Sequence, residues 1–371
     1  MIGVASRQPR PAMAPGPLVA LLAPLLPLGG VAGHSVGFVD SPVAVAGLVL
    51  LVGTLLLRRL AVGALSEAVI LSVGVAAGYG ATLRLLADGL APDAGLWLLL
   101  LGATLLLGRV LRLLAEVSGP ARHACPALFG LAILLLWEIL TRGLQVPAIL
   151  LPPPSAIAAA FATNAADLWD DFRQTVLISV LRGYLLGCGA GFAVAILADR
   201  VPFLARGLLP LGNLASAIPV VGVAPIMVMW FGFDWQSKAA VIVVMTFFPM
   251  LINTLAGLAS AERIQLDLMR SYAAGYWRSL LLLRLPCALP FLFNGLKINS
   301  TLALIGAIVA EFFGTPVVGM GFRISTQVAR MNLDVVWASI TVAALTGSLL
   351  YGALALAERR VTAWHPSFRK R

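Results

Sequence analysis

Long apolar segments, separated by short polar loops, recur along almost the whole chain. An α-helix needs about 20 consecutive apolar residues to cross the hydrocarbon of a membrane. The candidate segments are 17–33, 42–57, 63–87, 94–114, 127–146, 174–198, 208–231, 238–259, 288–312 and 335–357. The pattern therefore predicts an all-α fold, a polytopic membrane helix bundle with about ten transmembrane helices.

Basic residues gather in alternate loops of this pattern. With a cytoplasmic N-terminus, most Arg and Lys residues fall on the cytoplasmic side. Those left outside are Arg142, Arg173, Lys238, Arg323 and Arg330. Because cytoplasmic loops carry the excess of basic residues, we expect both termini in the cytoplasm. The segment 17–33, preceded by Arg7 and Arg10, could instead be a cleaved signal peptide, but the charge distribution favours a retained first helix.

The composition excludes a soluble domain. Of the 371 residues, 60% are hydrophobic and 11% are charged, whereas soluble domains carry about 25% charged residues. The formal net charge is +10, but the basic residues sit in short clusters and form no long basic face. Nucleic acid is therefore not expected as a partner, and membrane lipid is. We expect a multi-pass protein of the cell inner membrane.

The residues that usually carry catalysis or bind metals are scattered. Three cysteines and three histidines lie far apart, and none has the spacing of a metal site. A phosphate-binding P-loop needs Gly-Lys followed by Ser or Thr, yet none of the lysines (Lys238, Lys297 and Lys370) follows a glycine. The sequence thus predicts no catalytic residue, metal or cofactor, and any ATP used must bind to a separate chain.

Two parts of the chain differ in character. Residues 1–120 contain about four simple apolar spans with almost no polar side chains inside them, whereas residues 121–371 contain about six spans that carry polar residues. The longest cytoplasmic loop, 260–287, interrupts the second part. Its pattern predicts two short helices, Ala261–Tyr272 and Tyr276–Leu285, with small residues between them and a stop at Leu285-Pro286.

This loop resembles the EAA loop of permease subunits of ATP-binding-cassette (ABC) importers. The stretch "DLMRSYAAGYWRSLLLLRLPCALP" places Asp267 at the family's Glu, Leu268 and Met269 at its two alanines, and Ala273 at its Gly. The flanks "FFPMLINTLAGLAS", "LPCALPFLFNGLKIN" and "ALIGAIVAEFFG" resemble the nitrate/sulfonate/taurine-type branch. The resemblance covers roughly 125–366, and residues 1–120 fall outside it.

The resemblance implies the core of a type I ABC importer permease, with 260–287 as the coupling loop that docks in a cleft of an ATPase subunit. The implied partners are ABC ATPase subunits, a second permease copy (as a homodimer) and an extracytoplasmic solute-binding protein. The implied coupling residues are Asp267, Met269, Arg270, Ser271, Ala273, Ala274, Gly275, Trp277 and Pro286. The alternative is an ordinary amphipathic loop that lies on the bilayer.

Charged residues inside membrane spans are costly and are therefore functional candidates. Lys297 and Glu311 are fourteen residues apart, so they share one helix face about 21 Å apart, with Asn294 and Thr301 in the same arc. This stripe could line a translocation pathway, or Lys297 and Glu311 could each reach toward its own interface. Asn213, Ser216 and Pro219 are further pathway candidates, because broken helices are tolerated where they line a cavity. Glu138 and Arg182 fit structural pairing as well as a pathway role.

The sequence therefore indicates the membrane subunit of an ABC importer, which is not itself an enzyme. The branch it resembles handles sulfonate- or nitrate-like anions and vitamin precursors such as a thiamine pyrimidine or a flavin. An ion-gradient-driven secondary transporter is the alternative, although few acids and no internal repeat support it. A membrane-embedded enzyme lacks a catalytic constellation.

Overall fold

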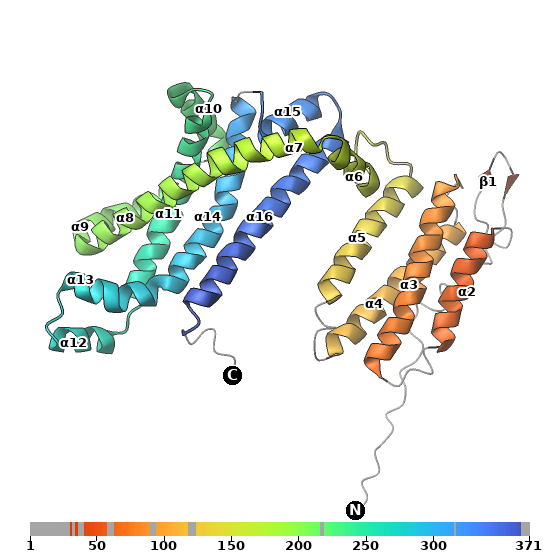
Figure 1. Cartoon of the computed structure of the whole chain (residues 1–371), viewed down its shortest axis with the longest axis horizontal. Coiled ribbons are helices and arrows are strands. Elements are labelled where there is room, and N and C mark those ends of the chain that lie inside the picture. Colours follow the sequence, from red (N-terminus) through yellow and green to blue (C-terminus); the bar gives the residue numbers. More distant parts are fainter. Residues whose placement is uncertain are drawn as a thin grey trace, which may run out of the picture. The chain divides into compact units, whose positions relative to one another are not determined.

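The computed structural model describes residues 30–31, 34–35, 41–57, 63–89, 94–117, 124–215, 219–314 and 317–364. Apart from a two-residue antiparallel pair, β1 (Gly30–Val31) with β2 (His34–Ser35), every described element is a helix (Figure 1). Seven of these helical stretches are long and apolar enough to cross a membrane. The predicted all-α membrane bundle is therefore confirmed, with its helix count only approximate.

Two compact units make up the chain, Met1–Ala156 and Ile157–Arg371. The first contains α2 (Pro42–Leu57), α3 (Ala64–Ala87), α4 (Ala94–Glu116) and α5 (Ala124–Gly143), and α6 (Pro154–Thr163) crosses the border. Ile139 of α5 belongs to the same apolar core as α3 and α4. The sequence-based boundary at residue 120 separates the part of the chain that resembles the permease family from the part that does not, and this boundary stays a prediction.

The second unit begins with α7 (Ala165–Phe172), the π-helical segment η5 (Arg173–Val180) and α8 (Leu181–Arg200). There follow α9 (Pro202–Ala215), α10 (Val220–Phe231), α11 (Trp235–Ala259), α12 (Arg263–Ser271), α13 (Tyr276–Ser279) and π-helical η6 (Leu280–Arg284). The last helices are α14 (Leu285–Phe313), α15 (Met320–Ala329) and α16 (Leu333–Val361). Within this unit, α12 and α13 lie at one end and α7, α10 and α15 at the other (Figure 1).

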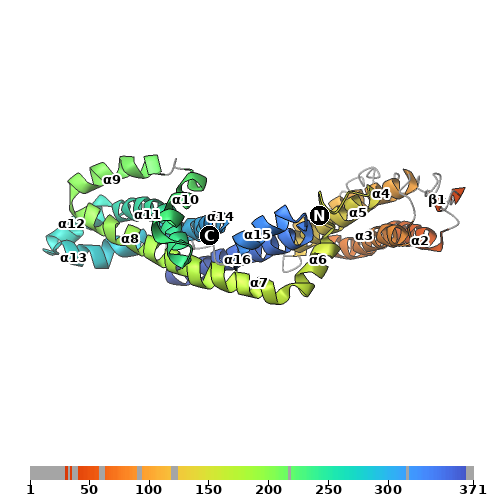
Figure 2. The ribbon, with the colours of Figure 1, turned by 90° about the horizontal axis from the view of Figure 1, so that it is seen from above.

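Three of the predicted spans do not correspond to a single long helix in the described part of the chain. Segment 17–33 lies outside the described residues. Segment 42–57 forms α2, which at 16 residues is short for a span. Segment 208–231 is not one helix but parts of two, and Figure 2 shows α9 and α10 as separate helices beside α11. Pro219 caps α10 in an extended conformation, with ψ at 116°, and has no N–H to continue a helix.

The predicted helix stop at Leu285-Pro286 is wrong. The chain stays helical from α13 through η6 into α14, and Leu285 itself is in the α region. Proline has no N–H to donate to the preceding turn of a helix. In the π-helical turn before Pro286 the hydrogen bonds span five residues, so the helix can continue past a residue without an N–H. The segment after the predicted loop is therefore a continuous rod that runs into the membrane helix α14.

Small residues bring the central helices of each unit into close contact. In the first unit, Gly47 faces Ala81 and Gly78 faces Ala103, where an added Cβ would come within 2.5 and 2.7 Å of the alanine Cβ atoms. In the second unit, Gly187 and Gly191 of α8 lie against α11 in the same way. In lipid, helices associate through such close packing, because burial of apolar surface provides little drive there.

The contact between α8 and α11 can be tested at one glycine. A Cβ on Gly191 would lie 2.5 Å from the carbonyl oxygen of Phe247, whereas a Cβ on Gly189 would meet nothing within 4 Å. We expect Gly191→Leu to lower the unfolding free energy by about 1–3 kcal/mol, because the helices must move apart. The control Gly189→Leu should leave stability unchanged or slightly higher. Thermal unfolding in detergent measures both, and equal melting temperatures would contradict the packing described.

Candidate functional site

The loop that follows α11 exposes an apolar surface. Glu262 caps the start of helix α12, and its backbone N–H donates to the side chain of Gln265. None of the residues of α12 is buried. Ile264, Leu268 and Tyr272 lie at helical spacing and are 78, 57 and 76% exposed. These residues give α12 an apolar face that is largely exposed within the described chain. Such a face is suited to another surface, protein or lipid.

Ala273 makes the turn between α12 and α13. Its φ is 50°, in the left-handed region, and its N–H donates to the carbonyl of Arg270 while that of Ala274 donates to Met269. This pair of bonds closes the C-terminus of α12 in the manner of a glycine cap. Ala273 stands at the position of the family's glycine, so the turn geometry gives a physical reason for that residue type. Gly275, by contrast, has an ordinary φ of −68°.

Behind the turn, a partly buried ion pair ties the loop to the membrane helices. Arg284 donates from both terminal nitrogens to the carboxylate of Asp199 at the end of α8, at 2.8 and 2.6 Å. Its Nε donates to the carbonyl of Leu258 near the end of α11, at 3.1 Å. The hydroxyl of Tyr276 donates to the same carboxylate, at 2.8 Å. Loop, α8 and α11 are thus held together at one arginine.

Sequence reasoning missed Asp199 as a member of this site. The sequence held one indication of its role: Asp199 is a single acidic residue beside Arg200, at the end of a predicted span and among loops that are otherwise basic. The guanidinium of Arg200 lies 5.6 Å from the ring centres of both Tyr276 and Trp277 and adds a cation–π contact to the junction.

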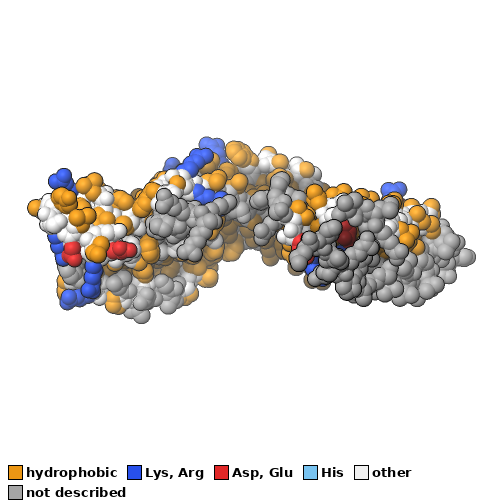
Figure 3. Space-filling model, turned by 90° about the horizontal axis from the view of Figure 1, so that it is seen from below, with side chains coloured by type: hydrophobic (Ala, Val, Ile, Leu, Met, Phe, Trp, Pro, Cys, Tyr) orange, Lys and Arg blue, Asp and Glu red, His pale blue; other side chains and the backbone are white. Residues whose placement is uncertain are grey.

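The other loop candidates lie on the surface of this end, which Figure 3 shows as hydrophobic patches beside basic and acidic ones. Asp267 pairs with Arg270 at 3.0 Å, and both side chains are largely exposed. The Ser271 hydroxyl donates to the carbonyl of Leu268, and Trp277 is 54% exposed. Pro286 lies inside the continuous helix described above. Their role in contacting a partner stays a prediction.

At the opposite end of the second unit, two buried carboxylates organise a polar cluster. Glu311 of α14 accepts from the hydroxyl of Thr175 and from the N–H of Gly321, at 2.8 and 2.7 Å. Asp171 accepts from the N–H of Gly319 at 2.8 Å and pairs with Arg323. The cluster joins η5, α14 and α15. It places Glu311 in a helix contact, so its predicted pathway role stays a prediction.

The predicted polar stripe of α14 divides between two environments. Lys297 pairs with Glu358 of α16 at 2.7 Å, and both side chains are at most 15% exposed. Asn294, which bonds to Asn253 at 3.1 Å, and Thr301 lie on the exposed face of the helix. Sequence reasoning did not identify Glu358 as the partner of Lys297, because the two are 61 residues apart.

The remaining candidates have local partners or lie outside the description. Glu138 pairs with Arg142 and accepts from Ser155, and Arg182 lies 4.5 Å from the ring centre of Trp235. Pro219 is exposed at the start of α10. Asn213 lies in α9, but its side chain and the whole of Ser216 fall outside the described residues. Within the described part of the chain, no three His, Cys, Asp or Glu residues gather as metal ligands do.

Comparisons with known proteins find membrane subunits of transport systems. A family model described as "Binding-protein-dependent transport system inner membrane component" matches residues 183–363. The riboflavin transport system permease of Chloroflexus aurantiacus is 31% identical over 70% of this chain and 98% of its own. The formylaminopyrimidine transport permease of Halalkalibacterium halodurans is 33% identical, over 64% and 95%. The taurine transport system permease of Escherichia coli is 30% identical, over 66% and 91%.

The turn at Ala273 generates a local test. Because a β-branched residue is strained in the left-handed region, Ala273→Val should weaken the cap of α12 by about 1–2 kcal/mol. The same change at Gly275, where φ is −68° and a Cβ would meet nothing within 4 Å, is the matched control. Hydrogen exchange of the Ala274 amide should speed up about 5- to 30-fold in the first variant only. Equal exchange in both variants would refute this account of the turn.

Proposed function

Because the chain belongs to the family of inner membrane components of binding-protein-dependent transport systems, we propose that it couples ATP hydrolysis on a separate subunit to the uptake of a small solute. As an ABC importer permease it is a transport protein and not an enzyme. The observation that carries the coupling proposal is the loop with an exposed apolar helix at its tip and a partly buried, ion-paired arginine at its base.

The tip and the base of the loop suit it to transmit motion from an ATPase subunit to the membrane helices. At the tip, Ile264, Leu268 and Tyr272 offer an apolar face to a groove in the ATPase subunit, a common way for a helix to bind a partner. At the base, Arg284 fixes the loop to α8 and α11. Because α13, η6 and α14 form one continuous helix, a displacement of the loop moves α14 as well.

Helix α14 then carries the motion to the translocation pathway. Its exposed face combines Asn294 and Thr301 with apolar Ile298 and Ile305, which are 44 and 45% exposed. A mixed face of this kind fits a second permease copy on one side and a polar path between the copies on the other. In this arrangement the two copies form a homodimer, the loop lies in the cytoplasm, and the end with α15 receives the solute-binding protein.

The names of the relatives are the basis for the substrate class that we propose. They transport riboflavin, formylaminopyrimidine and taurine. A sulfonate- or nitrate-like anion, or a vitamin precursor such as a thiamine pyrimidine or a flavin, fits this range. In such systems the solute-binding protein determines most of the substrate selectivity. The pathway lined by this chain needs only polar groups such as Asn294 and Thr301.

A pull-down of the tagged protein in mild detergent, with ATPase activity assayed on the eluate, tests the proposal. Leu268→Asp places a charge on the apolar face of α12 and should reduce retained ATPase by about thirtyfold, as expected when a central interface contact worth about 2 kcal/mol is lost. Val361→Asp, an exposed position at the end of α16, is the control and should retain the ATPase. If no ATPase co-purifies even with the unmodified protein, and uptake follows an ion gradient instead, the proposal fails.

A further inference from the structure

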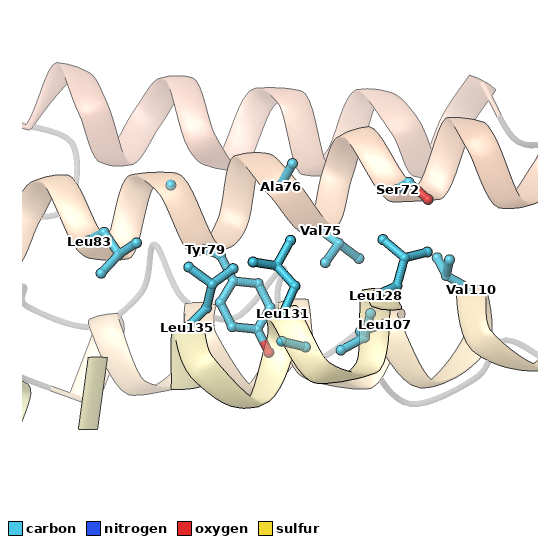
Figure 4. Close-up of a pocket in the computed structure, with 12 residues that line it drawn as sticks. Ser72, Val75, Ala76, Tyr79, Leu83, Leu107, Val110, Leu128, Leu131 and Leu135 are labelled. Atoms are coloured by element: carbon cyan, nitrogen blue, oxygen red, sulfur yellow. The ribbon is translucent and has the colours of Figure 1, made fainter. Parts of the chain in front are cut away.

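The N-terminal unit contains an apolar crevice that no part of the proposed transport function uses. It lies between α3, α4 and α5 and has a volume of about 250 Å³ (Figure 4). Val75 and Tyr79 of α3, Leu107 of α4, and Leu131 and Leu135 of α5 line it. The hydroxyl of Tyr79 bonds to Thr104 of α4 at 3.0 Å. The crevice is therefore lined by apolar atoms and is too poor in polar partners to hold water.

The crevice continues into a second, wider space of about 580 Å³ toward the C-terminal ends of α3 and α5. Gly80, Leu83 and Leu135 line both spaces, so the two adjoin and together form one long crevice. Between Ser72 at one end and Arg84 at the other, α3 rises by about 18 Å. This length compares with half of the roughly 30 Å hydrocarbon core, that is, with the depth of one leaflet.

Charged groups lie only at the wide end of this long crevice. Arg84 and Arg142 line it there, and each faces a carboxylate through Nε, Asp88 in the first case and Glu138 in the second. The side chains of Arg84 and Arg142 are 69 and 42% exposed, so their guanidinium groups remain accessible. The apolar crevice is thus about as long as one leaflet is deep, and two guanidinium groups, each beside a carboxylate, lie at its wide end.

We propose that this crevice binds one membrane phospholipid, with an acyl chain along Tyr79 and the phosphate against Arg84 and Arg142. An acyl chain matches the apolar lining and the length, and the open side of the crevice lets it enter laterally from the bilayer. Arginine binds phosphate oxygens through several N–H donors. The neighbouring Asp88, whose side chain is 41% exposed, makes a headgroup with an ammonium, as in phosphatidylethanolamine, the best fit.

Gly80 is the position at which the site can be closed without disturbing the fold. It lines both spaces, and a Cβ there would meet no atom within 4 Å. The Cβ of a larger side chain there meets no protein atom, and we expect the rest of a leucine side chain to occupy the crevice. Gly108 of α4 is equally open but lines neither space, which makes it the matched control.

Photolabelling tests the proposal with the full chain in vesicles of phosphatidylethanolamine and phosphatidylglycerol. The probe is phosphatidylethanolamine with a diazirine in one acyl chain, and labelled peptides are mapped by mass spectrometry. We expect the peptides that contain Tyr79 and Leu131 to be labelled above the other membrane-exposed peptides. Gly80→Leu should reduce this labelling about fivefold or more, and Gly108→Leu should leave it unchanged.

Two results would overturn the site. The first is equal labelling in Gly80→Leu and the unmodified protein. The second is labelling of these peptides no stronger than elsewhere, as expected when a protein segment or a second copy fills the crevice. A diazirine-labelled diacylglycerol, which lacks the phosphate, tests the headgroup contact. It should label the same peptides more weakly, and equal labelling by both probes would rule out a role for Arg84 and Arg142.

Discussion

The ion pair between Arg284 and Asp199 is the contact on which the loop's relation to the membrane helices depends. One guanidinium holds the end of α8, the end of α11 and the start of the α14 rod, and its side chain is only 18% exposed. Removing one partner of this partly buried pair leaves an uncompensated charge that is poorly solvated, which destabilises the junction. The geometry also requires arginine, because the compact ammonium of lysine cannot reach two carboxylate oxygens and a carbonyl together. In the coupling that we propose, this base would let the exposed, apolar tip of the loop move the membrane helices.

The same constraint, that polar groups in a membrane must be satisfied within the protein, shapes the rest of the second unit. Lys297 with Glu358 and Asp171 with Arg323 each join two helices by a buried charge pair. Glu311 receives its hydrogen bonds from Thr175 and Gly321. Between these polar contacts, glycines such as Gly187 let helices approach until their backbones nearly touch. Helix positions are therefore set by close packing and by a few charged contacts.

The sequence predicted much of this architecture and little of its pairing. Long apolar runs identify spans because the hydrocarbon thickness fixes their length, so α3, α4, α5, α11 and α14 could be foreseen. The partner of Lys297 could not be found, since contacts between distant residues depend on how helices pack. The Leu285-Pro286 stop failed because a π-helical turn overrides the local preference of proline. Pro219 indicated the break within 208–231, although continuous hydropathy led to a single predicted span there.

The most direct test of the coupling account is a distance measurement between spin labels on α14. Ile298→Cys, in a chain without its three native cysteines, places one label on the exposed face of each copy in the assembled transporter. The account predicts that the distance between the two labels changes when ATP and vanadate trap the ATPase. It also predicts that Arg284→Lys abolishes the change while the ATPase stays bound, and that Arg278→Lys, an exposed position in the loop, does not. A distance that responds equally in the Arg284 variant, or in no variant, would contradict the account.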